Sequence, residues 1–159
     1  MAAFLFIFLN MIVRNRELAD VYQTGREMRR LVENYWRDLG PWLNVSFLEY
    51  FNHVCELPYI PDPPEVETVS RPLYTLDPFY GPRDCDDKAV LLACWFHGHG
   101  RKSRFVASST RYNRELHHTF IQIVDGIYLD ATYKNFSNRL GFYPYFPKLT
   151  RVEVLTDWL

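Results

Sequence analysis

One cysteine, two adjacent histidines and one aspartate have the types and the order that thiol chemistry requires. Cys85 stands where an acidic run leads into an apolar segment. His117 and His118 precede a predicted strand, and Asp130 ends the next one. A thiolate is the reactive form of cysteine, a histidine stores and returns its proton, and a carboxylate fixes the tautomer of the histidine. These residues therefore predict a Cys-His-Asp triad with Cys85 as the nucleophile.

The predicted position of Cys85 at the start of a helix is expected to lower the pKa of its thiol. A helix N-terminus places partial positive charge beside the developing anion, and its amide N–H groups would form an oxyanion hole. A structural interpretation of each residue stays open. Cys85 is then a small buried hydrophobe, the aspartates beside it are helix-start acids, His117 is a solvated strand residue and Asp130 is a turn residue.

Helices are predicted in the first third of the chain. Apolar residues recur at helical spacing over residues 17–39, where Gly40-Pro41 ends the pattern, and again over residues 46–55 with Ser46 as a possible N-cap. The proline-rich residues 59–81 are expected to form an extended, ordered loop. So long a loop in a compact domain usually lines a site or wraps the core.

The second half of the chain predicts a buried helix followed by an antiparallel sheet. Residues 89–96 are apolar and are followed by two glycines, and strand patterns cover residues 103–108, 119–124, 127–130 and 150–155. This order predicts an α+β fold. We divide the single domain into an apolar N-terminal segment (1–16), a helical part (17–56), a proline-rich loop (57–82) and the catalytic helix and sheet (83–159).

Composition excludes several classes of protein. With 159 residues and 48% hydrophobic side chains the chain has room for one globular domain, and its net charge of −1 argues against binding of nucleic acid. Three cysteines cannot all pair, so a reducing compartment or at least one free thiol is expected. The apolar start is too short to span a bilayer and lacks the flanks of an export signal. We therefore expect no membrane partner and a cytoplasmic or virion-associated location.

Short motifs around these residues resemble the transglutaminase-like superfamily of papain-like cysteine enzymes, and most of all its small bacterial and phage-encoded members. The resemblance covers about residues 45–133, with the motifs in the family's order. It implies a helix that bears the cysteine, packed on an antiparallel sheet, with Cys85 as nucleophile, His118 as base and Asp130 as orienting carboxylate. The motifs are Tyr59-Ile60-Pro61-Asp62-Pro63-Pro64, Arg71-Pro72-Leu73-Tyr74-Thr75-Leu76, Asp84-Cys85-Asp86-Asp87-Lys88-Ala89, Arg104-Phe105-Val106-Ala107, His118-Thr119-Phe120-Ile121-Gln122 and Leu129-Asp130-Ala131-Thr132.

The chain departs from the family pattern in two places. The family usually has Gly-Asp-Cys before the catalytic helix, where this chain has Arg83-Asp84-Cys85, so the turn into the helix is expected to differ. The histidine is doubled, and neighbouring strand residues face opposite ways. A two-residue turn at 125–126 would put Asp130 on the face of His117, whereas a three-residue loop with Gly126 left-handed would put it on the face of His118. The family pattern favours His118.

No metal or cofactor is predicted. Cys94, His97 and His99 lie within six residues, but structural zinc needs four convergent ligands and no second pair is evident in the sequence. A helix C-terminus is the favoured interpretation of the two histidines. The sequence holds no glycine-rich phosphate loop, and the basic residues 101–104 are expected to form a solvated rim.

The expected function is thiol-dependent attack on a peptide or side-chain amide, with a thioester that is released to water or to an amine. Hydrolysis is favoured over transfer on the resemblance alone. The alternative is a structural or assembly protein of the same fold, for example of a phage particle, with an idle triad. The aromatic and proline-rich residues 142–147 would then serve as a docking surface. The expected partner is a peptide or protein substrate in the first case and phage structural proteins in the second.

Overall fold

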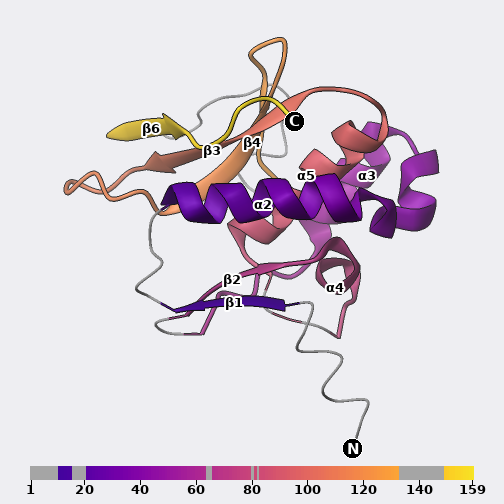
Figure 1. Ribbon diagram of the computed structural model, residues 1–159, viewed down its shortest axis with the longest axis horizontal. Helices are drawn as coiled ribbons and strands as arrows, with labels where there is room; N and C mark the ends of the chain where they lie inside the picture. The colour runs from indigo at the N-terminus through magenta and orange to yellow at the C-terminus, as the bar shows by residue number, and fades with distance from the viewer. Residues whose placement is uncertain (1–10, 16–20, 64–65, 80, 82, 133–148) are drawn as a thin grey trace, which may run out of the picture.

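Figure 1 shows the computed structural model of the protein, which describes residues 11–15, 21–63, 66–79, 81, 83–132 and 149–159. A four-stranded sheet of order β5-β4-β3-β6 lies on one side of the helices, and a two-stranded sheet of β1 and β2 lies on the other. Every strand pair is antiparallel. The described part of the chain therefore has an α+β fold, as the sequence predicts.

The N-terminal helices follow the predicted pattern with one change. Helix α2 (Val21–Tyr35) continues into the 3-10 segment η2 (Trp36–Asn44), in which Gly40 has a φ of 53°. This left-handed conformation breaks the helix where Gly40-Pro41 predicted its end. Helix α3 (Phe47–Glu56) begins after Ser46, whose hydroxyl accepts the Glu49 N–H at 3.3 Å, so the predicted cap is confirmed. The first residues of the predicted helix, 17–20, lie outside the described residues.

The prediction of a loop over residues 59–81 is wrong for its second half. Strand β2 (Val66–Ser70) pairs with β1 (Met11–Asn15), and the short helix α4 (Pro72–Leu76) follows it. The prolines flank the strand and do not interrupt it. Pro72 takes the first position of α4, where a missing backbone N–H has no helical partner to lose. The predicted loop therefore contributes a strand edge and a short helix to the region around the start of α5.

Helix α5 (Cys85–Gly98) forms the centre of the core. Residues 86–96 are all buried, among α2, η2 and the strands β3 and β4. The helix is apolar all round after its first turn, which is typical of a buried helix and confirms that prediction. Its end is packed tightly, since a Cβ added to Gly98 would lie 2.7 Å from Leu43 Cδ2.

The four-stranded sheet consists of β3 (Ser103–Ser109), β4 (His118–Ile123), β5 (Tyr128–Leu129) and β6 (Arg151–Val154). Strands β4 and β5 pair Ile121 with Leu129, so a three-residue loop joins them, and its Gly126 has a φ of 77°. This confirms the three-residue register, in which Asp130 falls opposite Phe120 and on the face of His118. The aromatic residues 142–147 lie outside the described residues.

Two further expectations, on the cysteines and on membrane-spanning segments, can be compared with the structure. Cys55, Cys85 and Cys94 are all free thiols. Within the described ranges, no helix combines the length and the apolar character needed to cross a bilayer.

Candidate active site

Cys85 is the first residue of α5, and its sulfur meets strand β4. The sulfur accepts a hydrogen bond from the backbone N–H of Thr119, the residue that follows His118. Strand β4 thus brings the predicted base next to the predicted nucleophile, although 33 positions separate the two residues in the chain.

Burial raises the pKa of the Cys85 thiol, so the predicted lowering is wrong for the resting protein. The sulfur lies among protein atoms, and the carboxylates of Asp84, Asp130 and Glu67 further disfavour the thiolate, while the Thr119 N–H opposes them. Desolvation and like charge outweigh the partial charge of the helix start. In the resting protein Cys85 is therefore a thiol, and its predicted role as nucleophile would require a base to remove the proton.

Hydrogen bonds hold the predicted base, His118, and its carboxylate in place. Its side chain is 3% exposed, and its Nε2 donates to Asp130 Oδ2 at 2.6 Å. The other oxygen of Asp130 accepts the Thr132 N–H at 2.8 Å, so the carboxylate is fixed from both sides. With the proton on Nε2, the Nδ1 atom of His118 carries the lone pair that can take a proton.

His117 has a different environment from its neighbour. Its Nε2 lies 3.3 Å from Thr110 Oγ1, and its Nδ1 lies 3.1 Å from the carbonyl oxygen of Glu115. Both contacts are at the exposed end of the sheet. The structure therefore brings His118, and not His117, to Asp130. The register of the hairpin decides between the two histidines.

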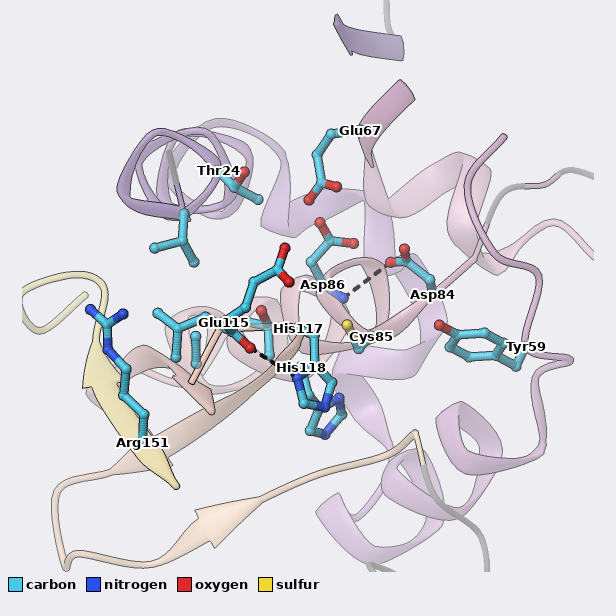
Figure 2. Close-up of a pocket in the computed structure, with 14 residues that line it drawn as sticks. Thr24, Tyr59, Glu67, Asp84, Cys85, Asp86, Glu115, His117, His118 and Arg151 are labelled. Carbon is cyan, nitrogen blue, oxygen red and sulfur yellow. Dashed lines mark hydrogen bonds between the residues drawn. The ribbon is translucent and has the colours of Figure 1, made fainter. Parts of the chain in front are cut away.

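Cys85 and His118 both line one cavity of about 430 Å³ (Figure 2). Its walls come from α2, the segment before β2, β2 itself, the start of α5, the sheet, and the residues that precede β4. Tyr59 and Glu67 line it from the segment that the sequence predicts to border a site. The remaining lining residues are Val21, Thr24, Asp84, Asp86, Ala107, Glu115, Leu116, His117, Thr119 and Arg151.

Three carboxylates gather at the start of α5. Asp84, Asp86 and Asp87 each place an oxygen within 4.8 Å of the others, a spacing that a cation could bridge. Asp84 and Asp87 form a capping box, and Asp87 Oδ1 also accepts the Ser70 N–H at 2.6 Å. Helix capping thus accounts for two of the three. The prediction that the protein binds no metal stays a prediction.

Lys88 is one of two buried cations that connect the segments around the site. The Lys88 ammonium, one turn after Cys85, donates to the carbonyls of Leu57 at 2.8 Å, Ala131 at 3.3 Å and Cys55 at 3.4 Å. Ala131 follows Asp130 directly, so Lys88 ties the orienting carboxylate to the helix that carries the nucleophile.

Arg83 stands where the motif that the chain resembles has glycine, and its side chain is built into the turn before α5. Its side chain is fully buried, its Nε donates to the Thr75 carbonyl at 2.7 Å, and its Nη2 donates to the Asp77 carbonyl. Its backbone exchanges two hydrogen bonds with Ile60, which sets Tyr59 in the cavity wall. The turn into α5 is therefore braced by a side chain.

The other cysteine and histidine group lies at the far end of α5. Cys94 is fully buried, and His99 stacks on Trp95 while its Nδ1 lies 2.7 Å from the Trp95 carbonyl. These contacts agree with the predicted helix C-terminus. Of the basic residues predicted to form a solvated rim, Arg101 and Lys102 are exposed as predicted. Arg104 differs, because it donates to Gln122 and lies over the Trp158 ring, and so packs on the sheet.

Sequence reasoning missed four contributors to the site. Glu67 and Glu115 line the cavity, Lys88 braces it, and the Thr119 N–H meets the sulfur. Only Glu67 had a signal, because it lies in the segment predicted to border a site. The others depend on strand register and on which side of α5 faces the sheet.

Comparison of the chain with family models, with curated proteins and with solved structures found no match. The site therefore has to be interpreted from its own geometry.

Proposed function

We propose that the protein is a thiol-dependent enzyme that attacks a peptide or side-chain amide through Cys85, with the transglutaminase-like, papain-like arrangement that its motifs resemble. One observation carries the proposal: His118 bonds Asp130 at 2.6 Å, while the next residue along the strand donates to the Cys85 sulfur. A histidine oriented by a carboxylate beside a thiol in a cavity wall is the arrangement that acyl transfer requires. The cavity of about 430 Å³ is large enough for part of a peptide.

The first half of the reaction forms a thioester. His118 Nδ1 takes the Cys85 proton, the sulfur bonds to the amide carbon, and the C–N bond breaks as His118 returns the proton to the leaving amine. Asp130 stabilises the imidazolium formed in between. Water or a second amine then attacks the thioester and restores the thiol. We favour water, so that the net reaction is hydrolysis of the amide.

The oxyanion position differs from a simple helix N-terminus. The N–H of Asp86 donates to Asp84 Oδ1 at 3.2 Å, and the N–H of Asp87 donates to Asp86 Oδ1 at 2.8 Å. These amides are therefore engaged within the helix start. The backbone N–H of Cys85 itself is the group of this turn that we assign to the developing oxyanion.

The second candidate is a structural or assembly protein with an idle triad, for which a phage particle is one setting. The raised pKa of Cys85 favours it, because burial and three carboxylates hold the thiol in its unreactive form. The two candidates differ in one measurable respect. Only the enzyme forms a covalent acyl bond to Cys85.

An activated ester tests for that bond without knowledge of the natural substrate. The protein is incubated with p-nitrophenyl acetate near neutral pH, and the acetyl group is located by peptide mapping and mass spectrometry. We expect acetylation of Cys85 ahead of Cys55 and Cys94. Asp130→Asn should slow it by about 10² to 10⁴-fold, because the histidine tautomer is lost.

Asp125→Asn is the matched control, since Asp125 is an exposed aspartate in the adjoining hairpin loop and its replacement removes the same charge. Its acetylation rate should stay within about twofold of the unaltered protein's. Acetyl groups that appear only on lysines or on the other cysteines would contradict the enzymatic proposal and leave the assembly role.

A further inference from the structure

The four-stranded sheet ends at β6, whose outer edge has no partner strand among the described residues. The order β5-β4-β3-β6 places β6 at the border of the sheet, where it pairs with β3 (Figure 1). An edge strand leaves every second N–H and C=O of its backbone unpaired, and these groups can pair with a strand of another chain. Strand β5, at the other border, has only two residues. The edge of β6 is therefore the candidate surface for strand addition.

The backbone of β6 determines which groups face this free edge. Leu155, which follows the strand, donates its N–H to a carbonyl of β3 at 2.9 Å. Because N–H groups alternate along a strand, those of residues 151 and 153 point to β3 as well. The N–H and C=O groups of Val152 and Val154 point away from β3. Hydrogen bonds to an added strand would therefore form at these two valines.

Exposed apolar side chains gather along the same edge. Val152 is 40% exposed and Val154 is 42% exposed, and both lie on one face of the sheet. On the opposite face, the Tyr22 side chain of α2 is 38% exposed and its hydroxyl donates to Glu153 Oε2 at 3.2 Å. A strand added beside β6 would remove apolar surface of the valines from water, which favours association.

The charges of β6 favour one partner and one register. Arg151 and Glu153 alternate with the valines. Antiparallel pairing with a second β6 that sets Val152 opposite the partner's Val152 also sets Arg151 opposite the partner's Glu153. A register that sets Val152 opposite the partner's Val154 would instead bring two Glu153 side chains together, where like charges repel. A second copy of β6 in the first register therefore meets opposite charges at both positions.

The ion pair within β6 leaves donors for this contact. Arg151 Nε donates to Glu153 Oε1 at 3.0 Å, and the two side chains are 37% and 34% exposed. A guanidinium has four further N–H groups on its two Nη atoms, and those of Arg151 have no partner among the described residues. These groups can donate to the partner's Glu153 while the bond within the strand persists.

We propose that β6 pairs antiparallel with β6 of a second copy of the chain, about a twofold axis at Val152. The pairing joins the two sheets into one, and each copy presents the same surface to the other. The net charge of −1 adds little repulsion between the copies. Arg151 lines the Cys85 cavity, so the partner's Glu153 lies beside that cavity in the dimer. The pairing does not depend on the chemistry of Cys85.

Sedimentation velocity of the full chain measures the association. The protein is studied from about 1 to 200 µM with a reductant present, because free thiols could otherwise form a disulfide between copies. We expect the sedimentation coefficient to rise with concentration from the value of a monomer toward that of a dimer, since an interface of one short strand is small. A monomer at every concentration overturns the proposal.

Single charge reversals test the register. Arg151→Glu sets carboxylates opposite each other at both symmetry-related positions, and Glu153→Arg sets guanidinium groups opposite each other. Each change should raise the dissociation constant of the dimer by about tenfold or more. Glu49→Arg is the matched control, because Glu49 is an exposed glutamate of α3, which lies at the opposite end of the molecule from β6 (Figure 1). Its dissociation constant should stay within about twofold of the unaltered protein's.

A mixture of the two variants separates a lost contact from a lost fold. When Arg151→Glu is mixed with Glu153→Arg, opposite charges face each other again across the interface. We expect heterodimers with a dissociation constant within about threefold of the unaltered protein's, and the double variant should pair with itself in the same way. Single variants that dimerise as well as the unaltered protein, or a mixture that stays monomeric, overturn the pairing through β6.

Amide hydrogen exchange in the unaltered protein locates the interface. The Val152 N–H donates to the carbonyl of the partner's Val152 in the dimer, so its exchange should slow by about tenfold from the lowest to the highest concentration. Val124, an exposed residue of the hairpin loop, is the reference and should exchange at a constant rate. A dimer that leaves the exchange at Val152 unchanged forms through another surface and overturns the proposal.

Discussion

The two ends of α5 carry the same kinds of residue in opposite surroundings. At the first end, Cys85 lies in a cavity wall beside His118. The buried carboxyl groups of the first turn and the Lys88 ammonium are on the same end of the helix. At the other end, Cys94 is fully buried and His99 stacks on Trp95. Each end of the helix therefore has a cysteine and a histidine nearby. Among the described residues, the first end is the one where a strand brings an oriented histidine to the sulfur and where the cavity of about 430 Å³ lies.

This difference shows that residue type alone does not define a thiol site. Burial raises the pKa of both thiols, so their titration does not distinguish them. What distinguishes them is the neighbouring element: β4 supplies His118 and the Thr119 N–H to Cys85. Packed aromatic rings surround the other end, where Trp95 contacts both Phe47 and Phe96. Substitutions at the two ends should therefore act on different properties.

The largest contrast is expected between the two cysteines. Cys85→Ser should reduce turnover of an activated ester by at least about 10³-fold, because a serine hydroxyl beside this histidine is a poor nucleophile. Serine is tolerated at a helix start, so the melting temperature should change little. Cys94→Ala should do the reverse, with turnover retained and a loss of about 1 kcal/mol in the free energy of unfolding from the cavity it leaves.

Ester turnover and thermal unfolding measured on both variants check this contrast. A Cys85→Ser protein that unfolds would show that Cys85 is a packing residue like Cys94, and the distinction between the two ends would be lost. Retention of turnover within tenfold would remove Cys85 from the proposed chemistry.

The next contrast concerns the paired histidines of the sheet. His118→Ala should slow acylation of Cys85 by about 10² to 10⁴-fold, since the thiol loses its base. His117→Ala should stay within about threefold, because His117 contacts Thr110 and Glu115 and does not contact Asp130. The rate of acetyl transfer to Cys85 measures both effects, and the opposite ranking would mean that the hairpin has the two-residue register.

The dependence of labelling on pH is expected to be smaller. Cys85 should react with iodoacetamide before Cys55 and Cys94, because it lines the cavity and they are buried. Its raised pKa favours the neutral thiol in the folded protein, so the reactive fraction grows as the pH rises. The labelling rate should thus increase by about tenfold per pH unit between pH 6 and pH 8. Peptide mapping of timed samples gives the rate; a flat profile over this range would mean that a thiolate already exists there.

The smallest effect is expected at the packed end of the helix. Gly98→Ala would put a Cβ 2.7 Å from Leu43 Cδ2 and 3.0 Å from Trp36 Cε3. Overpacking of this kind lowers the free energy of unfolding by about 1 to 3 kcal/mol, against which the better helix propensity of alanine recovers about 1 kcal/mol. Denaturant unfolding measures the net loss. The acylation rate of Cys85 should stay unchanged, and a change in it would mean that the two ends are coupled.

The sequence predicted those parts of the site that depend on local pattern. The acidic residues before an apolar run predicted the start of α5 at Cys85. The turn at 125–126 left two registers open, and the resemblance alone favoured the one in which Asp130 faces His118. The strand β2 was missed because its partner lies more than fifty residues earlier, and no local pattern encodes that pairing. The prediction of a lowered pKa for the Cys85 thiol was wrong for a similar reason. Packing of distant segments buries Cys85 and brings the carboxylates of Glu67 and Asp130 near it. This burial and these charges raise the pKa more than the partial charge of the helix start lowers it.

The buried hydrogen bonds of Lys88 join parts of the chain that are synthesised at different times, so the site cannot form before the later part has been made. Its ammonium donates to the carbonyls of residues 55, 57 and 131. Residue 131 lies 43 positions after Lys88 in the chain. A chain emerging from the ribosome exposes its N-terminal part first. Until residue 131 has left the exit tunnel, the nascent chain carries the Cys85 thiol without Asp130 and without the third carbonyl that holds Lys88. A translating ribosome therefore displays the Cys85 thiol before the carboxylate exists that the proposed chemistry would need.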